Sequence, residues 1–346
     1  MNNQNNMIDP NITKWPYYID PKNGENLEEN INSNNQLYLK SKTGDIYPII
    51  KGIPRIIDDS NNYSSAFGEQ WLYWQKTQLD SYSNTTISSD RLLRCLGNSL
   101  TNNIKRSQEP LQVLEVGCGA GRFTEILLKF PSIRLTSIDL SLAVEANSLN
   151  FPQDNYHRIV QADIMELPFK PMQYDIVICL GVIQHTPDPE KTIKKLYEQV
   201  KPGGDMVIDH YTFDISRLTK ITSNALRPIV KRLSSKNRMN VIKSLVNIFF
   251  PVHRLIRKLP ILQKIFSRIS PIVTYFHAYP ELNDNLQKEW SMLDTHDGLT
   301  DWYKHLRSLK QIKKLLRGIN ADSIDAWNDG NGVEARCKRP CNKIKI

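Results

Sequence analysis

The sequence predicts an α/β protein built on a doubly wound, mostly parallel sheet, with a helical insertion and a small N-terminal β-hairpin module. Short apolar segments alternate with helical segments from residue 111 to residue 214, which is the order expected of a parallel sheet with helices on both faces. The first apolar segment ends in a glycine-rich loop. At 346 residues, 40% of them apolar, the chain is long enough for one large domain with additions.

The first 110 residues are expected to form two additions to this sheet. Residues 36–57 alternate apolar positions around a Thr-Gly-Asp turn and predict a β-hairpin, whereas the Asn- and Glu-rich residues 23–35 predict a loop. Residues 64–100 predict two helices, the second carrying Leu92, Leu93 and Leu96 at helical spacing. We therefore expect a module at 1–60 and helices that cover a site at 61–110.

The central domain is expected at residues 111–214. Its predicted strands are 111–116, 133–138, 157–160, 174–179 and 204–210. A basic helical insertion or lid is expected at 215–292. Residues 293–346 then complete the sheet with a helix at 308–316 and two strands, 321–327 and 332–337, joined by a turn.

The net charge of +9 belongs to one segment. Residues 215–280 hold thirteen Lys and Arg and no Asp or Glu, whereas the other 280 residues carry 32 basic and 36 acidic side chains. We expect amphipathic helices here, broken at Pro228, Pro251, Pro260 and Pro271. Such a segment suits an anionic substrate or an anionic membrane surface, and a merely solvated basic face is the alternative.

The loop after the first strand differs from a dinucleotide-binding loop in its spacing. A G-x-G-x-x-G fingerprint needs its third glycine at position 122, but this chain has Arg122 there. Instead the chain reads E-x-G-x-G-x-G from Glu115 to Gly121. Three glycines in five residues at a strand-to-helix junction favour close approach of the backbone to a ligand over a simple turn.

Acidic residues follow the next strands. Asp139 ends the second strand, where its carboxylate can accept hydrogen bonds from two ribose hydroxyls. Asp163 follows the third strand within Ala162-Asp163-Ile164, and helix capping is the structural alternative for both aspartates. Asp175 begins the fourth strand and is expected to be structural. The sequence V-K-P-G-G at 200–204 precedes the fifth strand.

In this order, the motifs at 115–204 resemble those of class I S-adenosylmethionine-dependent methyltransferases, closest to members acting on small molecules in quinone, sugar and specialised-metabolite pathways. The resemblance implies a seven-stranded Rossmann-like sheet with an antiparallel last strand, and S-adenosyl-L-methionine as the cofactor. The cofactor-binding residues that it implies are Glu115, Gly117, Cys118, Gly119, Gly121, Asp139, Leu140, Asp163, Ile164, Leu180 and Gln184. Cys118 is expected in the glycine loop because a small side chain fits there, and it is not expected to act as a nucleophile.

Methyl transfer from a sulfonium mainly requires that the acceptor be held in line with the methyl group, so a base is needed only if the acceptor loses a proton. The resemblance places the end of the fourth strand opposite the sulfonium, which makes His185 the first candidate base. The alternative is a packing histidine that orients the Asp188 loop. His210 and Tyr211, at the end of the fifth strand, are second candidates.

A further catalytic candidate is His296, within L-D-T-H-D-G-L at 293–299. A similar L-D-T-x-D stretch occurs in relatives near the acceptor mouth, so His296 is expected to contact the acceptor or act as a base. Asp294 and Asp297 are expected to be local caps. The spacing of these residues matches no zinc site.

The N-terminal hairpin resembles the end of the small zinc-ribbon proteins that activate tRNA and protein methyltransferases, in its Tyr47-Pro48 and Gly52-Ile53-Pro54. That family has a C-x-x-C pair where this chain has Lys40 and Thr43. Because both thiolate ligands are missing, no metal is expected.

We therefore expect a cytoplasmic methyltransferase that modifies O or N of a small-molecule, lipid-linked or sugar-linked acceptor in biosynthesis. The expected partners are that acceptor, in an anionic or lipid-linked form, and an anionic membrane in peripheral contact. A methyltransferase of RNA or another nucleic acid is the alternative; it is disfavoured because the basic segment has few aromatic residues for stacking bases. A non-catalytic module would have no need of Glu115, Asp139 and Asp163 together.

Overall fold

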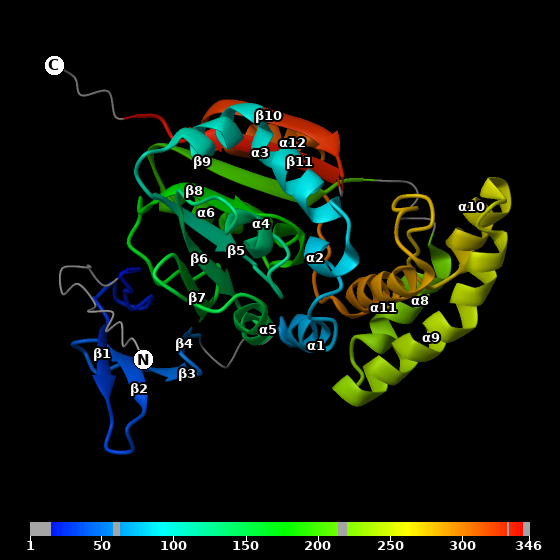
Figure 1. Ribbon diagram of the computed structural model, residues 1–346, viewed down its shortest axis with the longest axis horizontal. Coiled ribbons are helices and arrows are strands. Elements are labelled where there is room, and N and C mark those ends of the chain that lie inside the picture. The colour runs from blue at the N-terminus through cyan, green and yellow to red at the C-terminus, as the bar shows by residue number, and fades with distance from the viewer. Residues whose placement is uncertain (1–14, 58–62, 214–219, 331, 342–346) are drawn as a thin grey trace, which may run out of the picture.

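The computed structural model describes residues 15–57, 63–213, 220–330 and 332–341. At its centre five parallel strands are joined by an antiparallel pair, in the order β7-β6-β5-β8-β9-β11-β10 (Figure 1). The strands are β5 (Leu111–Val116), β6 (Ile133–Asp139), β7 (His157–Ala162), β8 (Tyr174–Cys179), β9 (Val200–Tyr211), β10 (Asp322–Asp329) and β11 (Gly332–Lys338). The predicted fold class, including the antiparallel last strand, is confirmed. Strand β9 begins at Val200, within the expected loop.

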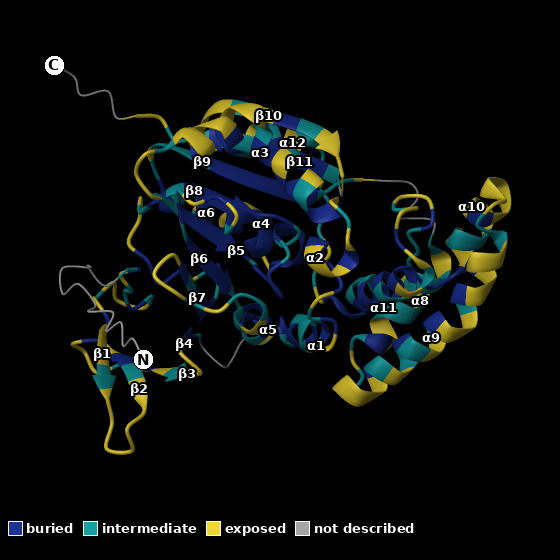
Figure 2. Ribbon diagram, viewed as in Figure 1, coloured by how far each residue is buried: buried dark blue, intermediate teal, exposed yellow. Residues whose placement is uncertain are grey.

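Helices cover both faces of this sheet because successive side chains of each strand point to opposite sides. On one face Leu114, Val177 and Ile208 pack with α6 (Pro189–Gln199) and α12 (Leu309–Gly318). On the other face Val113 and Leu135 pack with α3 (Ile87–Arg106) and α4 (Thr124–Leu127). The short α5 (Ala143–Asn150) follows β6. Figure 2 shows the sheet as the buried centre of the domain.

The expected N-terminal hairpin is present at residues 37–50, and the N-terminal strands also extend the central sheet. Strands β1 (Glu28–Ile31), β2 (Leu37–Lys40), β3 (Ile46–Ile50) and β4 (Ile53–Ile56) pair antiparallel in sequence order. β4 then pairs in parallel with β7. The prediction of a loop at residues 23–35 is wrong at residues 28–31, which form β1. Its side chains are mostly exposed and show no apolar alternation, so only the pairing with β2 identifies it.

Three helices, where two were expected, precede β5: α1 (Ser65–Tyr73), α2 (Asp80–Ser83) and α3. The carboxylate of Asp80, the first residue of α2, accepts hydrogen bonds from the backbone N–H groups of Ser88 and Ser89. These bonds satisfy free donors at the start of α3, so a new helix begins there. α1 lies against α5 and α11, the helix described next.

The basic segment forms α8 (Ile221–Val230), α9 (Ser235–Ile256) and α10 (Pro260–Ile269), and α11 (Asp284–Thr300) follows. Pro228 and Pro251 lie inside helices, so the breaks expected there were wrong. The residues four positions earlier, Asn224 and Asn247, are exposed, and water can satisfy carbonyls that lose a donor. The boundary expected at 292/293 falls inside α11. Within the described residues, no helix has both the length and the apolar character needed to cross a bilayer.

Candidate active site

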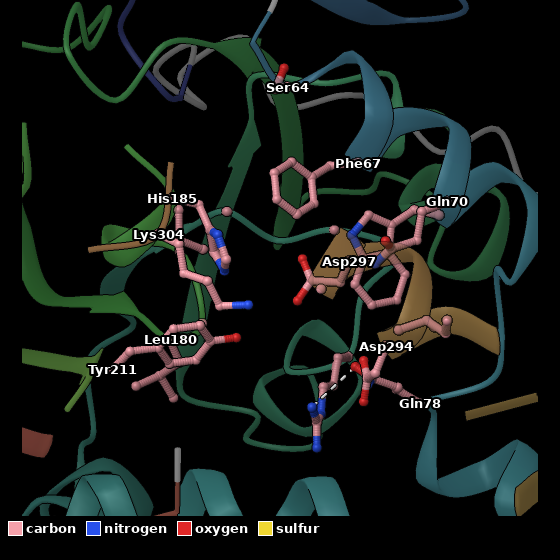
Figure 3. Close-up of a pocket in the computed structure, with 18 of the residues that line it drawn as sticks. Ser64, Phe67, Gln70, Gln78, Leu180, His185, Tyr211, Asp294, Asp297 and Lys304 are labelled. Carbon is pink, nitrogen blue, oxygen red and sulfur yellow. Dashed lines mark hydrogen bonds between the residues drawn. The ribbon is translucent and has the colours of Figure 1, made fainter. Parts of the chain in front are cut away.

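A cavity of about 500 Å³ lies where the carboxyl ends of β5, β6, β8 and β9 face α1, α8 and α11. This is the edge of an open α/β sheet at which ligands bind. Figure 3 shows side chains from the strand ends and from the helices pointing into the same open space. The sequence-predicted residues on its wall are Gly117, Cys118, Gly119, Asp139, Leu140, Ile164, Leu180, His185 and Tyr211.

The glycine loop needs its glycines for backbone conformation and for space. Gly117 has φ 75° and Gly119 has φ 53°, in the left-handed region. A Cβ atom on Gly117 would lie 2.1 Å from Cγ2 of Val182, and one on Gly119 would lie 3.1 Å from the indole of Trp71. The backbone of the loop therefore forms the cavity wall directly.

Asp139 is held in place by donors on both of its oxygens. Oδ2 accepts a hydrogen bond from Gly119 N (3.0 Å), and Oδ1 accepts from the backbone N (2.9 Å) and hydroxyl (2.7 Å) of Ser141. Burial raises the pKa of Asp139. Since a carboxylate can accept about four hydrogen bonds, it can still accept one from a ligand in the cavity. An anchored carboxylate beside a glycine loop fits the ribose of an adenosyl cofactor.

Glu115 lies beneath the loop, outside the part of the cavity wall that the structure describes. Its Oε2 accepts hydrogen bonds from the hydroxyls of Thr124 (2.6 Å) and Ser137 (2.8 Å). Only 2% of the residue is exposed, and burial raises its pKa to about 7. Glu115 is therefore placed to support the loop and not to touch a ligand.

Three other expected cofactor residues also stand back from the described cavity wall. A Cβ atom on Gly121 would lie 2.6 Å from the ring of Phe151, so this glycine serves packing behind the loop. Gln184 is buried, and its backbone carbonyl oxygen accepts a hydrogen bond from the backbone N–H of His305. Asp163 lines an adjoining hollow and accepts a hydrogen bond from Met165 N at 2.8 Å.

His185 ends a short 3-10 turn, Ile183–His185, that follows β8. Its Nδ1 lies 3.1 Å from the carbonyl oxygen of Tyr303 and 3.3 Å from Oδ2 of Asp301. Because a carbonyl and a carboxylate only accept, Nδ1 must carry the hydrogen, and Nε2 then holds a lone pair in the neutral ring. The rings of Phe67 and Tyr211 flank the imidazole, each centred 5.3 Å from it.

Two carboxylates control the charge of His185. Burial alone would lower the pKa of His185, but Asp297 and Asp301 outweigh that effect and raise it. Asp301 is 1% exposed, and its Oδ1 lies 2.6 Å from Nε of Arg227. Although burial opposes ionisation of Asp301, His185, Lys304 and Arg227 lower its pKa. Asp301 therefore stays ionised and stabilises a protonated His185.

The other two histidine candidates lie behind the described part of the cavity wall. His210 is 1% exposed, with Nδ1 2.8 Å from the carbonyl oxygen of Tyr211. His296 is fully buried, with Nδ1 3.1 Å from Oε1 of Gln70. Burial lowers the pKa of each to about 4. Of the three predicted bases, the structure brings only His185 to the cavity.

The sequence predicts Asp294 and Asp297 to be helix caps, and this prediction is wrong. Both residues lie inside α11 and line the cavity. Asn283 caps this helix instead. The hydroxyl of Tyr275 donates a hydrogen bond to Asp294, and burial raises the pKa of Asp294 to about 6. A helical reading of this segment would have found them, because positions 290, 294, 297 and 301 share one helix face.

Arg122 brings a positive charge to the same cavity without a carboxylate partner among the described residues. Its Nε donates to Ser88 Oγ (2.9 Å) and its Nη1 to Gln78 Oε1 (3.0 Å), both neutral acceptors. Burial lowers the pKa of Arg122 to about 10, so the side chain is still charged at neutral pH. A cation held in this way fits a carboxylate or phosphate on a bound molecule.

Comparison with known proteins agrees with this geometry. The family described as "Methyltransferase domain" matches residues 114–208. The chain is 27% identical over 139 residues to the malonyl-[acyl-carrier protein] O-methyltransferase of Priestia megaterium, covering 39% of this chain and 50% of that protein. It is 35% identical over 99 residues to the ubiquinone biosynthesis O-methyltransferase of Pseudomonas entomophila, covering 28% of this chain and 42% of that one.

These alignments span at most half the length of the curated relatives. Among solved structures, that of human N-acetylserotonin methyltransferase in complex with SAM has a TM-score of 0.44 and 14% identity, over 83% of this chain and 61% of that chain. The part of this chain that the family model matches, residues 114–208, includes the glycine loop and the strands around it.

Proposed function

We propose that this chain, whose residues 114–208 form a class I S-adenosylmethionine-dependent methyltransferase domain, methylates a small-molecule acceptor bound in the cavity, with His185 as the base. The observation that carries the proposal is that the glycine loop, Asp139 and His185 line one cavity. Cofactor residues and a histidine with a free lone pair are thus brought to the same space.

The residues on the strand-end side fit S-adenosylmethionine, which supplies an electrophilic methyl group on its sulfonium when bound. Gly117 and Gly119 let the cofactor approach the loop backbone, and Asp139 accepts a hydrogen bond from one of its ribose hydroxyls. Arg122 pairs with its carboxylate. Leu140 and Ile164 supply apolar contacts on the same side of the cavity.

The acceptor is proposed to be methylated on oxygen. An acceptor hydroxyl would donate a hydrogen bond to Nε2 of His185 and pass its proton there as the O–C bond forms and the S–C bond of the methyl donor breaks. The charge that develops on the imidazole is stabilised by Asp301, and the proton then leaves to water. A base with a raised pKa suits a hydroxyl, which must lose a proton. The two curated relatives described above, both O-methyltransferases, support this choice.

Calorimetric titration with S-adenosylmethionine tests the cofactor half of the proposal. Wild-type protein is expected to bind, and Gly119→Arg is expected to abolish binding because the new side chain would fill the cavity beside Trp71. Gly318→Arg is the matched control, since a Cβ atom there meets open space at the end of α12. Absence of binding by the wild type, or equal binding by Gly119→Arg, would overturn the proposal.

Transfer of a labelled methyl group tests the acceptor half. Incubation with host extract and labelled S-adenosylmethionine is expected to label a small molecule, and mass spectrometry of the product identifies the modified atom. Label recovered in RNA, with transfer that weakens as salt rises, would instead support the nucleic-acid alternative.

A further inference from the structure

Helix α10 buries polar residues and exposes apolar ones. Gln263, at 4% exposure, faces α9, where its amide lies 2.9 Å from Nδ1 of the buried His253. Nε2 of His253 lies 2.8 Å from the hydroxyl of Ser270, just beyond α10. Phe266 is half-buried against the same histidine. A polar network therefore fixes α10 to α9, and the apolar side chains of α10 are left for the outer face.

The outer face carries a continuous set of large aliphatic side chains, which we name the apolar ridge. Ile261 is 75% exposed and Leu255, at the end of α9, is 82% exposed. The ridge consists of Leu255, Leu259, Ile261, Leu262, Ile265 and Ile269, each at least half exposed. Figure 2 shows this end of the molecule, at the far side of the helical region from the sheet, as largely exposed. An exposed apolar surface of this size marks an interaction site.

Positive charges run along one edge of the apolar ridge. Lys264 and Arg268 are four residues apart and lie in a row next to the row of Ile261, Ile265 and Ile269 on the same helix. Lys258 stands in the turn before α10. All three are exposed, and none forms an ion pair with the part of the chain that is described. The whole segment 215–280 contains no acidic residue.

We propose that α10 and the end of α9 dock this protein onto an anionic lipid bilayer, with the apolar ridge at the boundary of headgroups and acyl chains. A helix with aliphatic residues on one face and Lys or Arg along its edge suits that position, and each basic side chain gains from negative lipid charge. A second copy of the chain fits less well, because two ridges packed antiparallel about a twofold axis perpendicular to α10 would bring their basic rows together.

The docking surface adjoins the cavity. The hydroxyl of Thr222 donates to the carbonyl oxygen of Ile269, the last residue of α10, and Ser223 Oγ donates to Pro271 O at 3.2 Å. Ser223 and Pro271 both line the cavity. A bilayer that meets the apolar ridge would therefore lie next to one wall of the cavity.

Vesicle co-sedimentation of the full chain tests this proposal without cofactor or acceptor, so its outcome is independent of the proposed function. Binding is expected to vesicles of equal parts phosphatidylglycerol and phosphatidylcholine and to weaken at high salt. Phosphatidylcholine alone should bind far less. The double variant Ile261→Asp/Ile265→Asp should lose at least about tenfold in partitioning, and Lys264→Gln/Arg268→Gln should lose about tenfold.

Two matched controls separate docking from general charge or folding effects. Leu149→Asp adds a charge at an apolar residue that is 71% exposed on α5, and Lys314→Gln/Arg317→Gln removes two exposed charges from α12. Both should bind vesicles as the wild type does, and circular dichroism should match for all variants. Equal binding to both vesicle types, or unchanged binding of the ridge variant, would overturn the proposal. The proposal would also be overturned if the wild type bound no vesicles but formed a dimer in solution, and the ridge variant were a monomer.

Discussion

The two walls of the cavity are built by different physical means. The strand-end wall is shaped by backbone: glycines with positive φ and N–H groups that donate to neighbouring carbonyls, as Gly117 N and Cys118 N both do to Ile138 O. The helical wall is shaped by side chains, through pairs such as Asp301 with Arg227 and Asp294 with Tyr275. A substitution in the first wall therefore changes shape, whereas one in the second wall changes charge.

His185 joins the two walls. Its backbone belongs to the turn after β8, but the groups that fix its ring, the carbonyl of Tyr303 and the carboxylate of Asp301, follow α11. The strand-end wall thus places the proposed base, and the helical wall sets the tautomer and the pKa of its ring. This division makes each wall separately testable.

The largest effect is expected from His185→Ala. Turnover should fall about 10²- to 10⁴-fold, because no other described histidine reaches the cavity to take the acceptor proton. Affinity for S-adenosylmethionine should stay within about twofold, since the shape of the strand-end wall is kept. Steady-state kinetics and calorimetry on one preparation measure both.

His210→Ala is the matched control for that change. His210 is also buried and lies near the end of the central strand β9, but it is behind the described cavity wall. Its variant should keep turnover within about tenfold of the wild type, with any loss explained by a lower melting temperature. If both variants lost turnover equally, the assignment of the base to His185 would be wrong.

A buried carboxyl beneath the strand-end wall, that of Glu115, should cost stability when it is ionised. The pKa of Glu115 is raised by burial to about 7, from an ordinary 4.5. A carboxyl with a raised folded-state pKa binds its proton more tightly when folded, so the free energy of unfolding falls as pH rises between about 4.5 and 7. The full loss is about 3 kcal/mol.

Glu115→Gln cannot ionise and isolates this effect. The difference in unfolding free energy between variant and wild type, from urea titrations, should rise by about 3 kcal/mol across that pH window and stay constant above it. The absolute value includes the cost of a buried amide, so the slope is the measured quantity. A flat difference would show that Glu115 ionises without penalty beneath the loop.

The contrast between the walls also explains which parts of the molecule the sequence revealed. The central strands are predictable because each is a short local run of apolar residues, and the glycine loop because its spacing is fixed by a turn. β1 was missed because Glu28, Glu29 and Asn30 carry no apolar alternation and pair only in the folded sheet.

The helical wall could not be read locally. α11 contains Thr295, His296 and Gly298, which are weak helix formers, so its helicity depends on packing against α8, α9 and α1. Asp301 reaches Arg227, 74 residues earlier, and His185, still farther back in the sequence. A single sequence does not report such contacts. Helical spacing would place the two aspartates on one face, but the weak helix formers of α11 do not predict a helix there, and caps are expected instead.

A smaller effect tests whether the helical wall sets the pKa of the base. The rate kcat/KM should rise with pH as His185 loses its proton, with a midpoint above the ordinary histidine value, because Asp297 and Asp301 raise its pKa. Asp301→Asn removes one of these charges and should move the midpoint down. Asp294→Asn is the control, because Asp294 is not among the groups that shift His185. An unmoved midpoint in Asp301→Asn would break the link between the walls.

The smallest effect is expected at Cys118, the one thiol on the described cavity wall. Burial raises the pKa of Cys118 well above its ordinary value, so the thiol stays protonated and unreactive at neutral pH. The side chain is 4% exposed and occupies space between loop and sheet. Cys118→Ala should therefore keep kcat within about twofold and lower the melting temperature slightly, as loss of a small buried group does. Turnover by kinetics and melting by calorimetry measure the two. A large loss of kcat with unchanged melting would show that the strand-end wall contributes chemistry as well as shape.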